Sequence, residues 1–257
     1  MNVKLISGAA MVAVLLLMAI AAPLIAAPYA TDLGMRLQPP GEAGFFGTDH
    51  LGRDVFSRVI YGARLSVAVS LITLAVSMLI GVTLGLAAGY FGGICDDVIM
   101  FVIEVLLAFP AMVLSLAIVA IAGAGIFNAA AAVSLVSWTH YARMVRGTAM
   151  SLKGQDYIVA SRISCASDMR IIFRHILPNL INPVIIYSAA NISSIIMQLA
   201  ALSFLGLGVQ PPTAEWGAML NDARGYITTA PWLIIAPSAG LVFMITGFNL
   251  LGEGLKE

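Results

Sequence analysis

Two ionisable residues in apolar parts of the sequence, Glu104 and His140, are the first candidates for chemistry. A titratable side chain in a membrane-spanning stretch is costly and is therefore a functional candidate by default. An enzyme embedded in a membrane would need a catalytic pair, such as two acids or a serine and a histidine on facing helices. Glu104 and His140 fall on different predicted helices. We therefore interpret them as residues of a pathway or as packing residues, with a membrane enzyme as a rival hypothesis.

The sulfur-containing residues indicate neither a disulfide framework nor a metal site. Cys95 and Cys165 are far apart in the chain, and neither belongs to a Cys-x-x-Cys pair. The 13 methionines are scattered without regular spacing, and methionine is an ordinary gap-filling residue in packed helices. We therefore predict no metal ligands and no cofactor bound by this chain.

The composition places these residues in a membrane protein. Only 10% of the 257 residues are charged and 60% are hydrophobic, with a mean hydropathy of +0.98. A soluble domain has about 25% charged residues, so this class is excluded. The 13 basic and 13 acidic residues balance, so the net charge gives no indication of nucleic-acid binding, and we expect a lipid bilayer to surround the chain.

Six stretches are long and apolar enough to cross a membrane, which takes about 20 helical residues. They cover residues 5–27, 66–89, 98–122, 128–147, 180–203 and 232–252. We predict an all-α polytopic protein in which residues 1–65 form an anchor helix with an extracytoplasmic loop, and residues 66–257 form a membrane domain of five helices. A cleaved signal peptide is the alternative for the first stretch, because Lys4 precedes it and the small residues Ala26 and Ala27 end it.

The positive charges indicate how the chain crosses the membrane. Residues 143–174 hold six basic side chains against the two acids Asp156 and Asp168, and short loops rich in Lys and Arg stay on the cytoplasmic side. We therefore expect both termini in the cytoplasm and the segments 28–65 and 204–231 outside.

The long cytoplasmic stretch 148–179 is predicted to contain two short helices. Asp156 caps the first, and Ser167 caps a second that starts at Asp168 and is stopped by Pro178. Ten residues are too few to cross a membrane, so the apolar stripe of the second helix must be buried against the bundle or in another protein. This stripe has helical spacing and comprises Met169, Ile172, Phe173 and Ile176, while Arg170 and Arg174 project from another face.

The two outer segments carry charged and aromatic residues. Asp49 and Asp54 alternate with Arg53 and Arg58, which predicts salt bridges inside the loop. A short helix around Trp216 is predicted to lie at the membrane surface, with the indole at headgroup depth. The candidates for an outer gate or a docking platform for a binding protein are Arg53, Asp54, Glu215 and Trp216. The alternative is that these side chains fold the outer segments onto each other.

Three segments resemble one family of membrane proteins. The first is a loop of the pattern Glu-Ala-Ala-x3-Gly-x9-Ile-x-Leu-Pro, matched here by Val159, Ala160, Ser161, Cys165, His175, Leu177 and Pro178. The second runs from Gly47 to Arg64, and the third from Ser203 to Gly217. Together they resemble the permeases of binding-protein-dependent ABC importers for dipeptides, oligopeptides and nickel, and in particular the C-type member of the two permeases.

The resemblance implies a type I importer architecture with six transmembrane helices and a cytoplasmic coupling helix that docks in a groove on an ATP-hydrolysing subunit. The residues it assigns to coupling are Tyr157, Ala160, Ser161, Arg162, Cys165, Asp168, Arg170, Phe173, Arg174, Leu177 and Pro178. It implies a bacterial inner membrane, a heterodimer with a sister permease, two subunits that bind ATP and Mg, and an extracytoplasmic substrate-binding protein. The sequence has no Gly-x4-Gly-Lys-Ser/Thr phosphate loop, so we expect ATP hydrolysis in separate subunits and no enzyme activity here.

Two positions depart from the family pattern. Val159 stands where the pattern has Glu, and Cys165 where it has Gly. If the bend needs a left-handed backbone, cysteine there costs roughly 1 kcal/mol or more; an ordinary turn would cost nothing. The segments similar to the nickel and metal-chelate branch are Ala160–Arg162, Thr213–Gly217 and Asn221–Arg224. Import of nickel or a chelate is therefore the first expectation, with dipeptides or oligopeptides as the alternative, and a channel or secondary transporter that works without ATP as a further rival.

Overall fold

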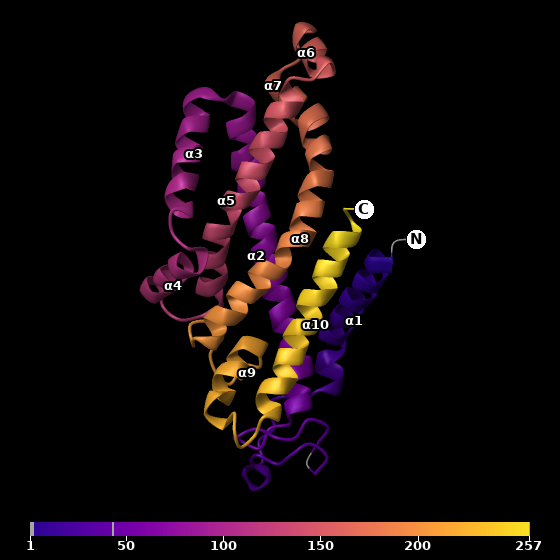
Figure 1. Cartoon of the computed structure of the whole chain (residues 1–257), viewed down its shortest axis with the longest axis vertical. Coiled ribbons are helices and arrows are strands. Elements are labelled where there is room, and N and C mark those ends of the chain that lie inside the picture. The colour runs from indigo at the N-terminus through magenta and orange to yellow at the C-terminus, as the bar shows by residue number, and fades with distance from the viewer. Residues whose placement is uncertain (1–2, 43, 257) are drawn as a thin grey trace.

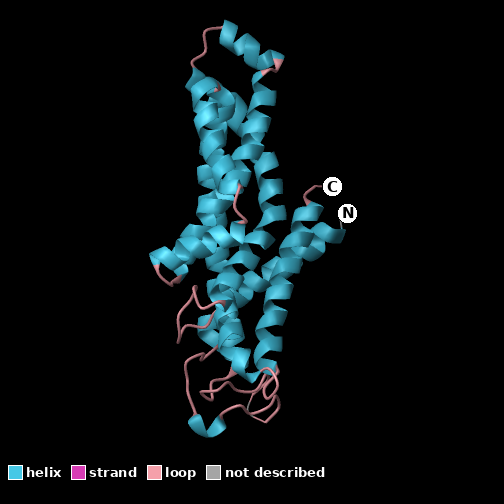
Figure 2. Ribbon diagram, turned by 60° about the vertical axis from the view of Figure 1, so that its left-hand side comes forward, coloured by secondary structure: helices cyan, strands magenta, loops and turns pink. Residues whose placement is uncertain are grey.

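The computed structural model describes residues 3–42 and 44–256, and within them the chain forms helices and no strand (Figure 2). The long helices are α1 (Val3–Ile25), α2 (Val55–Phe91), α3 (Gly93–Leu107), α4 (Ala111–Ala122), α5 (Ile126–Lys153), α8 (Leu177–Phe204) and α10 (Trp232–Gly254). The short elements are η1 (Leu33–Met35), α6 (Asp156–Ile163), α7 (Asp168–Ile171), the π-helical turn η2 (Ile172–Ile176), α9 (Trp216–Ala223) and η3 (Arg224–Tyr226). The prediction of an all-α polytopic protein is confirmed.

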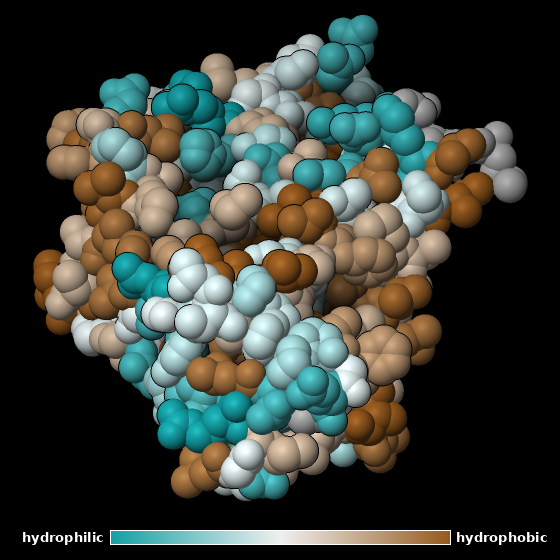
Figure 3. All heavy atoms as spheres, turned by 60° about the horizontal axis from the view of Figure 1, so that its bottom comes forward, coloured by the Kyte–Doolittle hydropathy of each residue, from teal (hydrophilic) through white to brown (hydrophobic). Residues whose placement is uncertain are grey.

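Loops and short helices gather at the two ends of the bundle (Figure 1). After the roles that the sequence predicts for them, we call residues 154–178 the coupling tip, and residues 26–54 with 205–231 the outer cap. Viewed towards the cap, hydrophilic residues gather over the middle of this end and hydrophobic residues crowd the flanks (Figure 3). Both α1 and α10 run between the cap and two neighbouring termini (Figure 1), which an ion pair joins between Lys4 Nζ and Glu253 Oε2 at 3.0 Å.

The core of the bundle is the contact between α2 and α5, which run side by side (Figure 1). Gly85 of α2 lies directly on the α5 backbone, where an added Cβ would be 2.4 Å from the carbonyl oxygen of Ala142. Gly81 and Gly89, one turn away on either side, are equally tight against α5. Small residues at this spacing let two membrane helices approach closely, so α2 and α5 form the rigid frame from which both ends are built.

Five of the six predicted spans are long and apolar enough to cross a membrane. Four of them are single helices, and the fifth is the pair of helices α3 and α4. The prediction of one straight helix over 98–122 is wrong, because α3 and α4 meet at an angle of 90°. Pro110 explains the break, since proline lacks the N–H that continues a helix and disfavours helical backbone at the residue before it.

The sixth predicted span, 128–147, lies within α5. This helix is long enough to cross a membrane, but its residues are less apolar than those of the other spans. Its polar residues Ser134 and Thr139 are buried inside the bundle, and each hydroxyl donates to a backbone carbonyl. A helix surrounded by other helices can be less apolar than one that faces lipid.

The outer loop ends earlier than predicted. The prediction starts a span at residue 66, whereas α2 begins at Val55 because the Asp54 carboxylate accepts a hydrogen bond from the Ser57 N–H at 2.8 Å and caps the helix. The division expected between residues 65 and 66 therefore falls within α2, which contains both the end of the predicted outer loop and the first span of the membrane domain.

Candidate coupling tip and outer cap

The coupling tip begins with α6, which a single buried side chain fastens to the bundle. Ile158 is fully buried among residues of α2, α5 and the turn η2. The N-cap of α6 is Gln155 rather than Asp156, which lies in the first turn, where an acid complements the helix dipole. Apart from Ile158 and half-buried Ser161, the residues of α6 are exposed.

Cys165 follows the end of α6 and has a left-handed backbone conformation, one of the two alternatives that the sequence analysis gave for this bend. Its φ is +56°, and its N–H donates to the carbonyl oxygen of Arg162 while the Ala166 N–H donates to that of Ser161, both at 3.0–3.1 Å. These two bonds form a Schellman motif with Cys165 at the position that glycine usually occupies. The structure therefore confirms that the bend needs a positive φ, and cysteine there is strained by about 1 kcal/mol.

The second short helix does not stop at Pro178, contrary to the sequence prediction. Ser167 caps α7 as expected, with its hydroxyl accepting from the Arg170 N–H, but α7, η2 and α8 form one continuous helix of 37 residues. The π-helical turn absorbs the proline, because the Leu177 N–H reaches back to the Ile172 carbonyl and the Asn179 side chain donates to the His175 carbonyl at 2.6 Å. The end of the tip is thus rigidly joined to the membrane span α8.

The predicted apolar stripe of this helix is split between two faces. Ile172 and Ile176 are buried together with Ile171, whereas Met169 and Phe173 are 62% and 61% exposed. The π-turn changes the spacing of the side chains, so a stripe drawn at regular helical spacing does not stay on one face. Burial against the bundle is therefore confirmed for Ile172 and Ile176 alone, and burial of Met169 and Phe173 in another protein stays a prediction.

The exposed surface of the tip combines apolar and basic side chains. Tyr157, Val159 and Ile163 of α6 are between 44% and 77% exposed and lie near Met169 and Phe173 in the chain. The predicted coupling residues that are exposed are Tyr157, Ala160, Arg162, Cys165, Asp168, Arg170, Phe173, Arg174 and Pro178, and those that are half-buried are Ser161 and Leu177. Such a surface is suited to docking on another protein, since apolar groups of this size gain free energy when they leave water.

Tyr90, which sequence analysis did not single out, ties the tip to the bundle. Its hydroxyl donates to Asp168 Oδ1 at 2.5 Å, and its backbone carbonyl accepts from Lys153 Nζ at 2.6 Å. The guanidinium of Arg162 lies 5.9 Å from the centre of its ring. One tyrosine at the end of α2 therefore contacts α5, α6 and α7. The only signal in the sequence was an aromatic residue at the end of a span.

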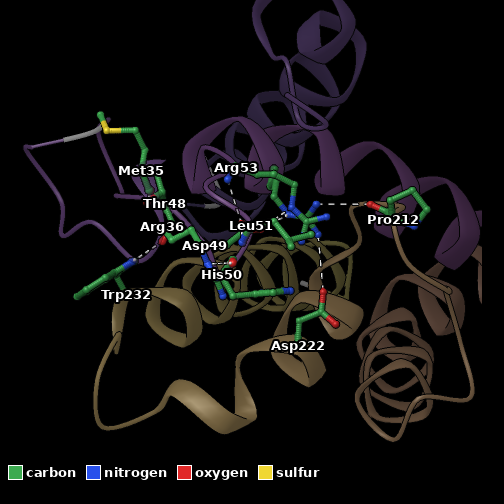
Figure 4. A network of polar contacts seen from close by, with 11 residues as sticks. Met35, Arg36, Thr48, Asp49, His50, Leu51, Arg53, Pro212, Asp222 and Trp232 are labelled. Carbon is green, nitrogen blue, oxygen red and sulfur yellow. Dashed lines mark hydrogen bonds and ion pairs between the residues drawn. The ribbon is translucent and has the colours of Figure 1, made fainter. Parts of the chain in front are cut away.

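The outer cap is organised around one buried carboxylate, shown in Figure 4. Asp49 accepts from the N–H groups of Leu51 and Arg53, at 2.8 and 3.0 Å, and its Oδ2 lies 2.6 Å from Arg53 Nε and 3.6 Å from Arg58 Nε. Arg58 reaches further, to Asp222 of α9 at 3.9 Å and to the Pro212 carbonyl at 3.5 Å. The predicted salt bridges within the loop are confirmed for Asp49, while Asp54 serves as a helix cap.

Glu215 and Trp216 join the second part of the cap to α2. The Glu215 carboxylate accepts from the Gly217 and Ala218 N–H groups at 2.9 Å and from the Ser66 hydroxyl at 3.0 Å. Trp216 is fully buried, and its indole N–H donates to the Val59 carbonyl at 2.8 Å. The indole of Trp216 therefore packs inside the protein, and these contacts fold the outer segments onto each other; its position at headgroup depth stays a prediction.

Glu104 and His140 are exposed in the single chain, on α3 and α5. These two helices meet where Ile103 packs against Trp138, and again nearer the tip, where Arg146 forms a two-pronged ion pair with Asp96 at 2.5 and 2.7 Å. In the described part of the chain no three His, Cys, Asp or Glu side chains come together in a group that could hold a metal ion.

Comparison with known proteins matches the chain to one family and one fold. Residues 81–257 match the model of the family described as "Binding-protein-dependent transport system inner membrane component". The dipeptide transport system permease protein of Alkalihalophilus pseudofirmus is 41% identical over 258 residues, with 100% of this chain and 85% of the relative covered. The glutathione transport system permease protein of Pectobacterium atrosepticum is 45% identical, with 85% and 72% covered.

A solved structure shares the fold. The methionine ABC transporter MetNI in inward-facing conformations superposes with a TM-score of 0.62 over 77% of this chain and 94% of that chain, at 16% sequence identity. The architecture is therefore that of a type I importer permease, as the sequence predicted.

Proposed function

Because the chain belongs to the family of binding-protein-dependent transport system inner membrane components, we propose that it forms half of the translocation pathway of an ATP-driven importer for short peptides. The support for peptides comes from the relatives, which are named for the transport of dipeptides and of glutathione, itself a modified tripeptide. This replaces the expectation of nickel or a metal chelate, which neither relative supports.

The observation that carries the proposal is the construction of the coupling tip. It presents exposed Tyr157, Met169 and Phe173 beyond the membrane spans, while Ile158, Ile171 and Ile176 fasten the same short helices to the bundle. A tip that is rigidly joined to α8 can pass a movement of its partner directly to a membrane helix, since one continuous helix extends from Asp168 to Phe204.

The partners follow from this assignment. Two ATP-binding subunits, which hold ATP and Mg, would receive the tip on the cytoplasmic face, and a sister permease would complete the pathway. A substrate-binding protein would meet the outer cap, and the chain would span the inner membrane with both termini in the cytoplasm. The cap can serve as a docking platform because its buried ion pairs hold residues 26–54 and α9 as one unit.

Uptake into vesicles tests the proposal. The chain is reconstituted with its sister permease, ATPase subunits and binding protein, and a labelled dipeptide, glutathione and nickel are supplied in parallel. We expect uptake of one of the two peptide ligands with ATP inside, and none without the ATPase subunits. Uptake of nickel alone would restore the first expectation, and uptake without ATP would favour a channel or secondary transporter.

A further inference from the structure

We propose that a groove on the side of the outer half of the molecule binds one acyl chain of a membrane phospholipid. The groove has a volume of about 810 Å³ and lies between α1, α2 and α10. Val14 and Met18 line it on α1, Ala239 and Phe243 line it on α10, and Phe46 and Trp216 of the outer cap also line it.

The chemistry of the walls admits only an apolar ligand. All 16 lining residues are hydrophobic side chains, proline or glycine. The two indole N–H groups among them are already used, because Trp216 donates to the Val59 carbonyl at 2.8 Å and Trp232 donates to the Thr48 carbonyl at 3.2 Å. A polar ligand would lose its hydrogen bonds to water in this groove and gain none in return.

The groove opens sideways between two helices that qualify as membrane spans, and it is covered towards the cap and towards the termini. Val14 on α1 and Ile235 on α10 line it and are 46% and 64% exposed, and both helices qualify as membrane spans. Towards the outside it is covered by Phe46, whose ring packs against that of Phe56 at 5.4 Å. Towards the termini, α1 and α10 close on each other at Gly247, where an added Cβ would lie 3.0 Å from Met11.

The size of the groove favours a hydrocarbon chain over a helix of a partner subunit. One turn of a helix with its side chains, about 10 Å across, occupies roughly 400 Å³. The groove therefore holds about two turns, whereas a partner helix crossing the membrane needs about 20 residues. A flexible acyl chain enters from the bilayer and packs against the exposed walls at Val14 and Ile235.

Photolabelling of the assembled importer tests the proposal. The complex is reconstituted in phosphatidylethanolamine vesicles that contain a diazirine on one acyl chain, extracted into detergent to remove loosely held lipid, and then illuminated. Mass spectrometry of the peptides should find retained label near Val14–Met18 and Ala239–Phe243. Ala239→Phe, and independently Val14→Phe, should fill the groove and lower this label about fivefold, which corresponds to about 1 kcal/mol of binding.

Val242→Phe is the matched control, because Val242 is also exposed on α10 but does not line the groove, and it should leave the label unchanged. Equal labelling in all three variants would overturn the proposal, since it would mean that only surrounding lipid is detected. Labelling of the isolated chain that disappears in the assembled importer would assign the groove to the sister permease instead, and would also overturn it.

Discussion

The coupling tip and the outer cap are the two ends of one bundle. Basic side chains are buried and paired at the cap, whereas basic and large apolar side chains are exposed at the tip. At the cap, Arg53 and the neighbouring Arg58 of α2 are only 3% exposed and share the carboxylate of Asp49. In the tip, the basic side chains Arg170 and Arg174 are exposed, and so is the large apolar side chain of Phe173.

This difference shows where each end finds its partners. A buried charge needs a counter-charge within the chain, because an unpaired one is strongly destabilising, and the cap supplies it through Asp49 and Asp222. An exposed apolar ring such as Phe173 has no such partner in the chain and gains free energy only when another protein covers it. The cap is therefore held together by its own ion pairs, whereas the tip has the exposed apolar surface that the proposed docking of an ATPase subunit needs.

Removing the central carboxylate of the cap should have the largest effect. Asp49→Ala leaves Arg53 and Arg58 buried without their shared partner, so the free energy of unfolding should fall by about 3–5 kcal/mol. Thermal unfolding of the purified chain in detergent measures this. Asp32→Ala, which removes an exposed carboxylate that accepts from the Gly34 N–H, should cost no more than about 1 kcal/mol. Equal losses for the two variants would contradict the central role of Asp49.

Phe173→Ala should weaken binding of the ATPase subunit without destabilising the chain. The exposed ring is expected to contribute about 2 kcal/mol to the interface, a roughly 30-fold change in affinity, while the unfolding temperature should stay constant. A titration of the reconstituted permeases with labelled ATPase subunit gives the affinity. Ile181→Ala, which removes a comparably exposed side chain from α8 beyond the tip, serves as the control. An equal loss in both variants would mean that the tip is not the docking site.

Tyr90→Phe should loosen the tip while leaving the cap unchanged. The variant loses the hydroxyl that donates to Asp168 but keeps the ring, so the free energy of local opening should fall by about 1 kcal/mol. Hydrogen exchange of residues 155–171 should then become about fivefold faster. Tyr61→Phe is the control, because the Tyr61 hydroxyl has no hydrogen bond within residues 3–42 and 44–256. Unchanged exchange in Tyr90→Phe would contradict the role of the Tyr90 hydroxyl in holding the tip to the bundle.

Cys165→Gly should have the smallest effect and the opposite sign. Glycine adopts the φ of +56° at this position without steric cost, so the variant should be more stable by about 0.5–1 kcal/mol. Thermal unfolding of the purified chain in detergent measures this gain. Cys165→Ala keeps the strained backbone and should leave the unfolding temperature unchanged. A destabilised glycine variant would show that the thiol makes a contribution larger than the strain.

The frame of the molecule could be predicted from the sequence because hydropathy depends on local composition. The positions of α1, α8 and α10 follow from long apolar runs, and the cap of α7 follows from Ser167. The pattern of charges around Asp49 also predicted its ion pair with Arg53 correctly, since residues four apart on one segment readily meet.

The remainder depended on contacts between distant segments or on irregular backbone. The π-turn over Ile172–Ile176 changes the spacing of the side chains before Pro178, and regular helical spacing gives no sign of such a turn. Tyr90 lies 78 residues from Asp168 in the sequence, so its role appears only after folding. The burial of Trp216 inside the protein was missed for the same reason, because its partner is the carbonyl of Val59, 157 residues away.

The most direct test of the contrast between the two ends is hydrogen exchange of the reconstituted permease pair with and without its ATPase subunits. We expect the subunits to protect backbone amides within residues 156–174 while those of the outer cap, residues 26–54 and 205–231, stay unchanged. Protection of the cap with no change at the tip would contradict the assignment of the tip as the docking site.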